Sequence, residues 1–212
     1  MTCGNQVRPF ALVICGVPAA GKSTLTAVAA SVLGVSLVSS DLVRKELAGL
    51  SASDRALPGH YSDSFSRLVY AELGRRAAAC AHARSGVIVD ATFRRRRDRA
   101  AFVGAFGSAA PVLYAECHAP LRVLLGRAER RDGGGAPVSD ATAEVVAREH
   151  GQWQPLDEIQ AGHHVTICTD QAIALAAAEL AAAIRNPSWQ DERRGRPRAC
   201  VTRPCCGEGV GW

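Results

Sequence analysis

One octapeptide near the start of the chain has the composition and spacing of a phosphate-binding loop. Gly16-Val17-Pro18-Ala19-Ala20-Gly21-Lys22-Ser23 gives GxxxxGKS, between an apolar run and a helical pattern, which is the context this motif requires. The glycines let backbone N–H groups point at phosphate oxygens, and the helix N-terminus adds its positive dipole end. Lys22 would reach the β- and γ-phosphates, and the Ser23 hydroxyl would ligate Mg²⁺. We therefore predict that residues 16–24, ending at Thr24, bind ATP and Mg²⁺.

The alternative for this segment is an ordinary strand–turn–helix with coincidental glycines. It is disfavoured because only two lysines occur in the chain, Lys22 and Lys45, and one of them fills the lysine position of the motif.

A second group of polar residues follows the next apolar run, in Ser39-Ser40-Asp41-Leu42-Val43-Arg44. A carboxylate at Asp41 could accept the proton of an attacking hydroxyl, and Arg44 lies one helical turn later. The alternative is that Asp41 caps the following helix, which accounts for the acid but not for the arginine. We predict that Asp41 is catalytic and that both residues bind substrate.

The third apolar run, residues 87–89, ends in Asp90, and Thr92 follows two positions later. An acid at the end of a buried strand resembles the element that holds Mg²⁺ through water in enzymes with phosphate loops. A carboxylate that caps the next turn explains the same pattern equally well. Asp90 is therefore a candidate metal ligand and Thr92 a candidate substrate-binding residue.

Arginines supply the remaining candidates. Arg94 to Arg97, with Arg99, form a basic run after this strand, and most of the run is expected to be solvated surface. Arg94 stands nearest the strand end, so it could meet an anionic substrate. Arg127 and Arg130 precede three consecutive glycines, as in a lid that closes over a transferred phosphoryl group. For either of these two, a solvated helix face is an equally good interpretation.

The elements that must position these residues alternate along the chain. Strands are predicted at residues 11–15, 35–39, 87–90, 111–117 and 164–168, and helices at 22–33, 41–48, 62–84, 95–106, 120–130, 139–150 and 171–184. Residues 50–61 are expected to form a loop. This order predicts an α/β fold in three layers, with a five-stranded parallel sheet and helices on both faces. Ligands then bind beyond the carboxyl ends of the strands, where the candidate residues gather.

The 212 residues suffice for one domain, predicted over residues 1–185 with a lid at about 127–140. A disordered, Arg- and Cys-rich tail is predicted over residues 186–212. The chain has a net charge of +5, and the tail, with five Arg against three acids, carries +2 of it. The remaining +3 is an ordinary value, so the charge is weak evidence for nucleic acid. The eight scattered cysteines form no CxxC, which favours free thiols and a soluble, cytoplasmic protein; Cys200, Cys205 and Cys206 could form a metal site but lack its usual spacing.

Together, GVPAAGKST, VSSDLVRKEL, GVIVDATFRRRRDR, HAPLRVLLGRAERR and VSDAT resemble the P-loop NTPase kinases often labelled AAA-type ATPases, which are similar to gluconate kinase, polynucleotide 5′-kinase and zeta-toxin-like kinases. The resemblance covers residues 9–150. It implies nucleotide and Mg²⁺ contacts for Lys22 and Ser23, a general base at Asp41, a substrate-phosphate contact for Arg44, and a lid arginine at Arg127 or Arg130.

Three functions are compatible with these residues. The leading prediction is ATP-dependent phosphorylation of a hydroxyl on a small molecule. A polynucleotide 5′-hydroxyl kinase would use Arg44 and the arginine run, although no aromatic stacking platform is visible. A regulatory ATP-binding module or slow ATPase would not need Asp41 and Arg44 beside the γ-phosphate. No membrane partner is expected.

Overall fold

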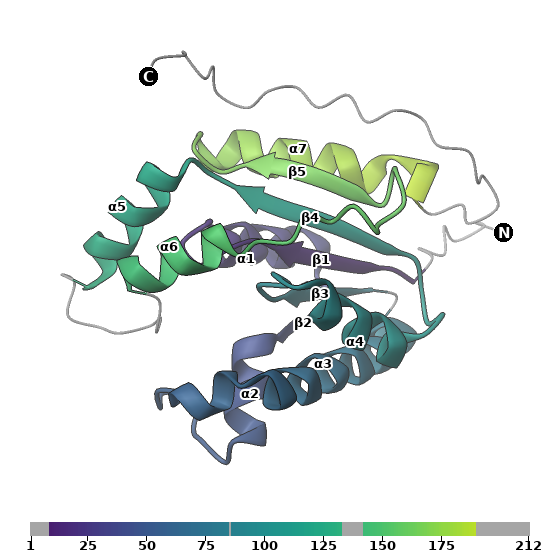
Figure 1. Ribbon diagram of the computed structural model, residues 1–212. Coiled ribbons are helices and arrows are strands. Elements are labelled where there is room, and N and C mark those ends of the chain that lie inside the picture. Colours follow the sequence, from purple (N-terminus) through teal and green to yellow (C-terminus); the bar gives the residue numbers. More distant parts are fainter. Residues whose placement is uncertain (1–8, 85, 133–141, 190–212) are drawn as a thin grey trace, which may run out of the picture.

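The computed structural model describes residues 9–84, 86–132 and 142–189. Within them, five strands form one parallel sheet in the order β2-β3-β1-β4-β5 (Figure 1). The strands are β1 (Ala11–Cys15), β2 (Ser36–Ser39), β3 (Val87–Asp90), β4 (Val112–His118) and β5 (His164–Cys168). The predicted fold is confirmed, and the predicted strand ends are displaced by one residue at most.

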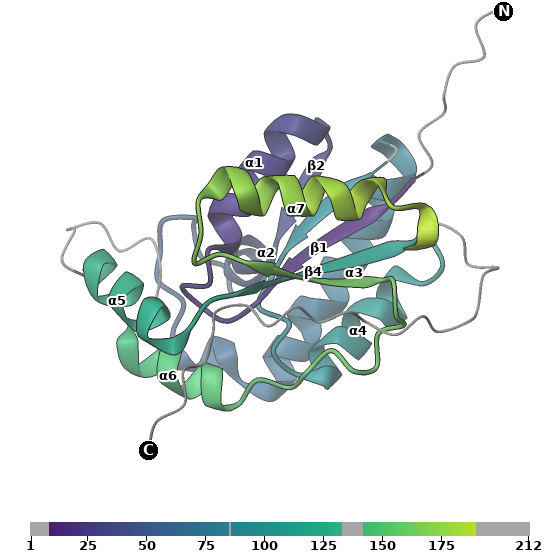
Figure 2. The same cartoon turned by 90° about the horizontal axis from the view of Figure 1, so that it is seen from above.

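Helices cover both faces of this sheet. They are α1 (Lys22–Leu33), α2 (Ser40–Leu47), α3 (Asp63–Arg84), α4 (Arg96–Phe106), α5 (Leu121–Asp132), α6 (Ala143–Gly151) and α7 (Ile173–Arg185). Figure 2 shows α1 and α7 on one face and α3 and α4 on the other, while α5 and α6 lie beyond the carboxyl ends of the strands. Because both faces are covered, the central strand β1 is apolar and buried at every position.

The helices α3 and α4 approach each other closely at Gly74. A Cβ atom at this position would lie 2.5 Å from the carbonyl oxygen of Phe102, so only glycine allows this crossing. The crossing matters for the site because α4 begins directly after the turn that follows β3.

Three segments differ from expectation. The loop at residues 50–61 contains a 3₁₀ helix, η1 (Pro58–Tyr61). The helix α6 is capped by Thr142, whose hydroxyl accepts a hydrogen bond from the amide of Val145, rather than by a residue at 139–140. The predicted tail begins at residue 186, yet η2 (Pro187–Trp189) is ordered.

Trp189 extends the folded core past the predicted end of the domain. Its ring is 1% exposed, its indole N–H donates to the carbonyl of Ala183 at 3.1 Å, and it meets Phe10 edge-on with ring centroids 6.1 Å apart. The remainder of the predicted tail, with Cys200, Cys205 and Cys206, lies outside the described residues. The four cysteines within them, Cys15, Cys80, Cys117 and Cys168, are free thiols.

Candidate nucleotide and phosphoryl-transfer site

The phosphate loop begins where β1 ends, between its two neighbouring strands. Gly16 has φ 139°, and a Cβ atom there would lie 2.5 Å from the carbonyl oxygen of Cys117 on β4. Its amide donates to the carbonyl of Thr92, beyond β3, at 3.2 Å. Glycine is therefore required at this turn for both its conformation and its close packing.

Lys22 curls back over the loop that precedes it. Its ammonium group donates to the carbonyls of Gly16 at 2.9 Å and Val17 at 3.0 Å. Ser23 and Thr24 are exposed in the first turn of α1. The predicted nucleotide-binding residues are thus brought together at the N-terminus of α1, with the Lys22 ammonium held against the loop carbonyls.

Arg127, from α5, supports this loop from behind. Its guanidinium donates to the carbonyl of Ala19 at 3.3 Å and to both the hydroxyl and the carbonyl of Thr169, just after β5. The Thr169 hydroxyl in turn donates to the carbonyl of Ala20 at 2.9 Å. The guanidinium of Arg127 is therefore engaged by main-chain oxygens, whereas Arg130, one turn later, is exposed. Most of the predicted lid, residues 133–141, lies outside the described residues.

The two candidate acids stand at the ends of adjacent strands. Asp90 is aligned with Ser39 of β2 on one side and Ile14 of β1 on the other. Burial raises the pKa of the Asp90 carboxyl, Lys22 lowers it, and the charge of Asp41 raises it further. The charges of Lys22 and Asp41 therefore both act on the Asp90 carboxyl.

Asp41 itself is half exposed and forms an ion pair with Lys45, with 3.0 Å between Nζ and Oδ2. The helix α2 begins at Ser40 with Ser39 as its N-cap, so Asp41 lies in the first turn of the helix and not at the cap position. The ion pair of Asp41 with Lys45 was not predicted from the sequence, although their i,i+4 spacing on a helix could have indicated it.

The oxygen-bearing residues at this edge fit a magnesium ion better than a metal held by protein alone. Within the described part of the chain, no group of three or more His, Cys, Asp or Glu side chains could hold a metal. Mg²⁺ commonly takes one or two protein oxygens and completes its shell with phosphates and water. The exposed Ser23 hydroxyl and the Asp90 carboxylate at the end of β3 are suitable donors.

Arg44 is held inside the protein rather than extended into solvent. It is 7% exposed, and its Nη1 donates to the carbonyl of His60 and, at 3.4 Å, to the hydroxyl of Ser66 on α3. Its guanidinium also lies 4.7 Å from the ring centroid of Tyr61. The role of Arg44 in substrate binding stays a prediction, and it would use a guanidinium that these contacts hold in place.

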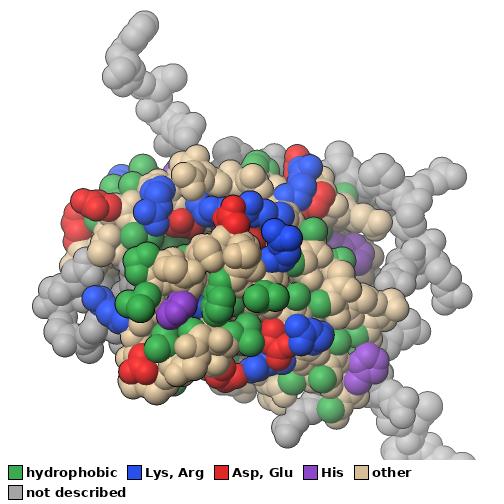
Figure 3. All heavy atoms as spheres, turned by 60° about the horizontal axis from the view of Figure 1, so that its bottom comes forward, with side chains coloured by type: hydrophobic (Ala, Val, Ile, Leu, Met, Phe, Trp, Pro, Cys, Tyr) green, Lys and Arg blue, Asp and Glu red, His purple; other side chains and the backbone are tan. Residues whose placement is uncertain are grey.

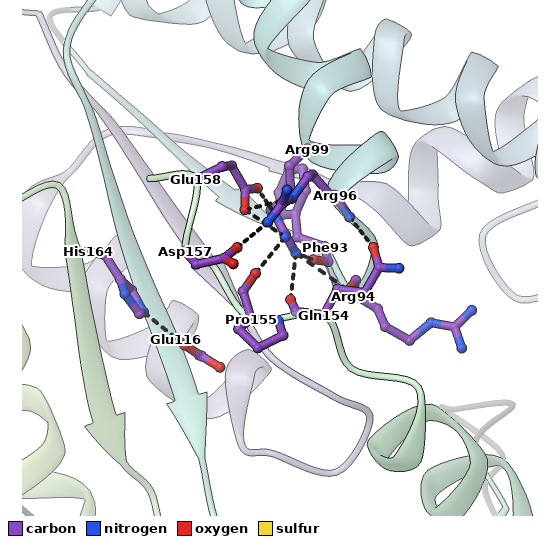
Figure 4. A network of polar contacts seen from close by, with 10 residues as sticks. All are labelled: Phe93, Arg94, Arg96, Arg99, Glu116, Gln154, Pro155, Asp157, Glu158 and His164. Atoms are coloured by element: carbon purple, nitrogen blue, oxygen red, sulfur yellow. Dashed lines mark hydrogen bonds and ion pairs between the residues drawn. The ribbon is translucent and has the colours of Figure 1, made fainter. Parts of the chain in front are cut away.

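The arginines after β3 are paired with acidic side chains, several of them at the surface, and Figure 4 shows part of this network. The ion pairs are Arg94 with Glu149, Arg95 and Arg97 with Asp63, Arg96 with Asp157 and Glu158, and Arg99 with Glu158. Figure 3, which brings the bottom of Figure 1 forward, shows Lys and Arg side chains next to Asp and Glu side chains on that face. Such pairing neutralises the charge that a nucleic acid would need.

Arg99 is the member of this run for which the surface expectation is wrong. It is 1% exposed and donates to the carbonyls of Phe93 at 2.8 Å, Gln154 at 3.0 Å and Pro155 at 2.9 Å. It thereby ties the turn after β3 to the segment after α6. That turn is strained, because Phe93 is not glycine and has φ 52°. Its position directly after Thr92 places the strain at the site.

A small cavity of about 260 Å³ lies beside the first residues of the phosphate loop. Its lining combines loop, strand and helix residues: Gly16, Val17, Glu116, Cys117, His118, Ala119, Leu124, His150 and Trp153. The side chain of one lining residue, Glu116, contacts His164 of the neighbouring strand β5 at 2.8 Å (Figure 4). Sequence reasoning missed the cavity because its residues come from four separate segments.

Comparisons with known proteins agree with this architecture. A family model described as an AAA domain matches residues 12–156. No curated protein matches the chain significantly. Among the described residues, none of the helices is both long and apolar enough to cross a membrane.

Solved structures with the same fold include three kinases. A gluconokinase from Sinorhizobium meliloti 1021 is 21% identical, with a TM-score of 0.60 over 83% of this chain and 91% of that one. A sugar kinase from Janibacter sp. HTCC2649 is 18% identical, with a TM-score of 0.65 over 84% and 94%. A putative kinase from Chloroflexus aurantiacus j-10-fl is 22% identical, with a TM-score of 0.58 over 82% and 98%. At these identities, the likeness establishes the fold.

Proposed function

The chain belongs to the AAA-domain family of P-loop proteins, and on that premise we propose that it is a kinase that transfers the γ-phosphoryl group of Mg-ATP to a hydroxyl of a small molecule. The observation that carries the proposal is the grouping of Lys22, Asp90 and Asp41 at the ends of adjacent strands, where the charges of the other two shift the pKa of Asp90. A nucleotide switch needs Lys22 and Asp90 to hold Mg-ATP, whereas transfer of the phosphoryl group to a hydroxyl also needs a base, which is the role we propose for Asp41. The kinases among the solved structures of the same fold support this choice.

Each residue has a role in the transfer. Lys22 neutralises the terminal phosphates, and Ser23 with Asp90 would hold Mg²⁺, which supplies further neutralisation of those phosphates when it is bound. Asp41 accepts the hydroxyl proton as the acceptor oxygen bonds to the γ-phosphorus and the bond to the β–γ bridging oxygen breaks. Arg44, Thr92 and Arg94 would orient the acceptor, and Arg127 or Arg130 would offset charge on the transferred group.

A polynucleotide acceptor is less well supported. The arginines that motivated it are ion-paired, and Arg44 is buried against η1 and α3. A chain that bound nucleic acid through them would first have to separate these pairs. We therefore keep the small-molecule acceptor as the conclusion.

The test is ATP turnover by the purified protein, with and without pooled acceptors: sugar acids, neutral sugars, nucleosides, aminoglycosides and 5′-hydroxyl oligonucleotides. Lys22→Ala serves as the blank, and we expect it to lower turnover by at least about 100-fold. Turnover that rises with one small-molecule pool supports the kinase. Slow turnover that no acceptor changes would instead indicate a regulatory ATP-binding module.

A further inference from the structure

The small cavity beside the phosphate loop adjoins the carbonyls that bind Lys22. Gly16 and Val17 line the cavity, and the Lys22 ammonium donates to the carbonyl oxygens of these two residues at 2.9 Å and 3.0 Å. Lys22 is also the residue proposed to neutralise the terminal phosphates of ATP. A molecule in this cavity would therefore lie next to the part of the loop where the phosphoryl group is transferred.

Another wall of the cavity is tied to the turn that follows β3. His150 and Trp153 form this wall, and the Trp153 amide donates to the carbonyl of His150 at 3.2 Å. Directly beside them, the Gln154 amide donates to the carbonyl of Arg94 at 3.0 Å, and Glu149 pairs with the Arg94 guanidinium at 2.9 Å. The cavity is thus bounded by the phosphate loop and by a segment fixed to the neighbouring strand end.

The volume of the cavity suits a molecule with one ring. It measures about 260 Å³, whereas sites for drug-sized ligands usually measure about 300–1,000 Å³. A cavity of about 150 Å³ holds benzene, so this one has room for a six-membered ring with its substituents. A nucleoside, which has a base and a sugar, and an aminoglycoside, which has several rings, are larger than the space provided.

The side chains that line the cavity combine apolar surface with groups that form hydrogen bonds. Trp153 and Leu124 offer aromatic and aliphatic surface, and Glu116, His118 and His150 carry the polar atoms. A sugar ring has the matching composition, because its C–H groups form an apolar face and its hydroxyls lie around the edge. Binding sites commonly use such a mixture, in which apolar groups supply contact area and a few polar groups fix the orientation.

Glu116 gives the lining its electrostatic character. This side chain is 17% exposed, and its Oε2 lies 2.8 Å from Nε2 of His164. None of the described residues that line the cavity is an arginine or a lysine. An ionised carboxylate can only accept hydrogen bonds, so it favours O–H and N–H groups. A carboxylate or phosphate on the acceptor would be repelled by Glu116 and would meet no cationic side chain in the lining.

We propose that this cavity binds the phosphate acceptor, and that the acceptor is a single-ring sugar without a carboxylate or phosphate group. Glu116 accepts hydrogen bonds from the sugar hydroxyls, Trp153 covers one face of the ring, and the reacting hydroxyl points towards the phosphate loop. This inference rests on the proposed kinase function. It narrows the acceptor to one class of small molecule and excludes sugar acids.

The test measures sugar binding by NMR titration to full-length protein saturated with Mg²⁺ and a non-hydrolysable ATP analogue. D-Glucose and D-galactose are the neutral probes. D-Glucuronate has the glucose ring with a carboxylate, and D-glucosamine at pH 6 has the same ring with an ammonium group. Glu116→Gln is compared with the wild type and with Glu129→Gln, which removes an exposed acid from α5 outside the cavity.

We expect at least one neutral sugar to bind the wild type and Glu129→Gln equally, and at least about 10-fold more tightly than glucuronate. In Glu116→Gln, loss of a charge-assisted hydrogen bond should weaken binding of the neutral sugar by about 10-fold. The same substitution should reduce the discrimination against glucuronate, which a purely structural role of Glu116 would leave unchanged. Glucosamine binding as tight as that of glucose, or tighter, would support the site and extend it to cationic sugars.

Three results would overturn the proposal: no binding of either neutral sugar to the wild type, glucuronate binding as tightly as glucose, or unchanged sugar affinities in Glu116→Gln. A second variant tests the same cavity without disturbing the pair of Glu116 and His164. His118→Ala removes an exposed lining side chain and should also weaken binding of the neutral sugar.

Affinity for the ATP analogue distinguishes an acceptor cavity from a pocket for the adenine base. We expect Glu116→Gln and His118→Ala to bind the analogue as tightly as the wild type does, which also shows that both variants are folded. Weaker analogue binding with unchanged sugar binding would assign the cavity to the nucleotide and reject the proposal.

Phosphoryl transfer from ATP to the bound sugar, followed by ³¹P NMR, keeps this inference separate from the kinase proposal. Sugar binding that depends on Glu116 but leads to no transfer would support the sugar site and remove the kinase function. Transfer to glucuronate but to neither neutral sugar would keep the kinase and reject this inference.

Discussion

Asp41 lies at the N-terminal end of α2, half exposed and paired only with Lys45. An exposed ion pair contributes little to stability, about 1 kcal/mol or less, so this carboxylate can be removed without unfolding the protein. The role of base is proposed for it because its charge and that of Lys22 both act on the Asp90 carboxyl.

We therefore expect Asp41→Asn to lower kcat by about 10²- to 10⁴-fold while the KM for ATP and the melting temperature stay the same. The matched control is Asp54→Asn, which removes an exposed carboxylate that accepts a hydrogen bond from the Ser51 amide. Both variants are compared by their acceptor-dependent ATP turnover. Full phosphotransfer activity in Asp41→Asn would mean that another group is the base.

Two buried thiols beside the phosphate loop are expected to be inert. Burial raises the pKa of Cys117 to about 12, and burial likewise raises that of Cys15 well above its usual value. Below the raised pKa the group remains a thiol, and only the thiolate is nucleophilic. Iodoacetamide at pH 8 should spare both residues in the native protein and modify both in urea, as measured by peptide mass spectrometry. Rapid native labelling of Cys117 would show that the loop opens.

At the scale of elements, the segments that hold the site are joined by arginines rather than by apolar contacts alone. Arg99 connects the turn after β3 to the segment after α6, and Arg127 connects the phosphate loop to β5. The position of Thr92 and of the loop glycines therefore depends on residues that need not touch a substrate.

Removing the Arg99 side chain should be costly, because it takes the guanidinium donor away from four carbonyls and from Glu158, which keeps only its longer ion pair with Arg96. We expect Arg99→Ala to lower the free energy of unfolding by about 3–5 kcal/mol in urea denaturation. Arg97→Ala, an arginine from the same helix whose side chain is half exposed, should cost about 1 kcal/mol or less. Similar losses in the two variants would contradict the buried role of Arg99.

At the scale of the whole molecule, the ends of the described chain pack against each other. Trp189 lies against Phe10, just before β1, and both belong to the core on the α1 and α7 side of the sheet. A residue that follows the last helix, Trp189, therefore packs over the start of the central strand.

Trp189→Ala should accordingly destabilise the protein by about 3–5 kcal/mol, as expected for a large aromatic side chain removed from a core. Thermal unfolding followed by circular dichroism measures this, and Ser188→Ala, an exposed neighbour, is the control. A melting temperature equal to the wild type in Trp189→Ala would place the end of the domain back at residue 185.

Local sequence determined the elements and the phosphate loop, because a strand, a glycine turn and a helix follow from the spacing of neighbouring residues. The register of the strands then brought Asp90 next to Ser39, one residue before α2, as the rule for parallel sheets implies. The cap at Thr142 and the short helix at η1 were missed, since residues at several nearby positions could have served equally well.

Only the tertiary structure decided what the arginines do. Arg94 to Arg99 form one run in sequence, yet the partners of Arg94, Arg96 and Arg99 lie about 55 to 61 positions away. Spacing carries no information about such partners, and burial is set by packing of distant segments, which made Arg99 an interior residue and Arg96 a surface one.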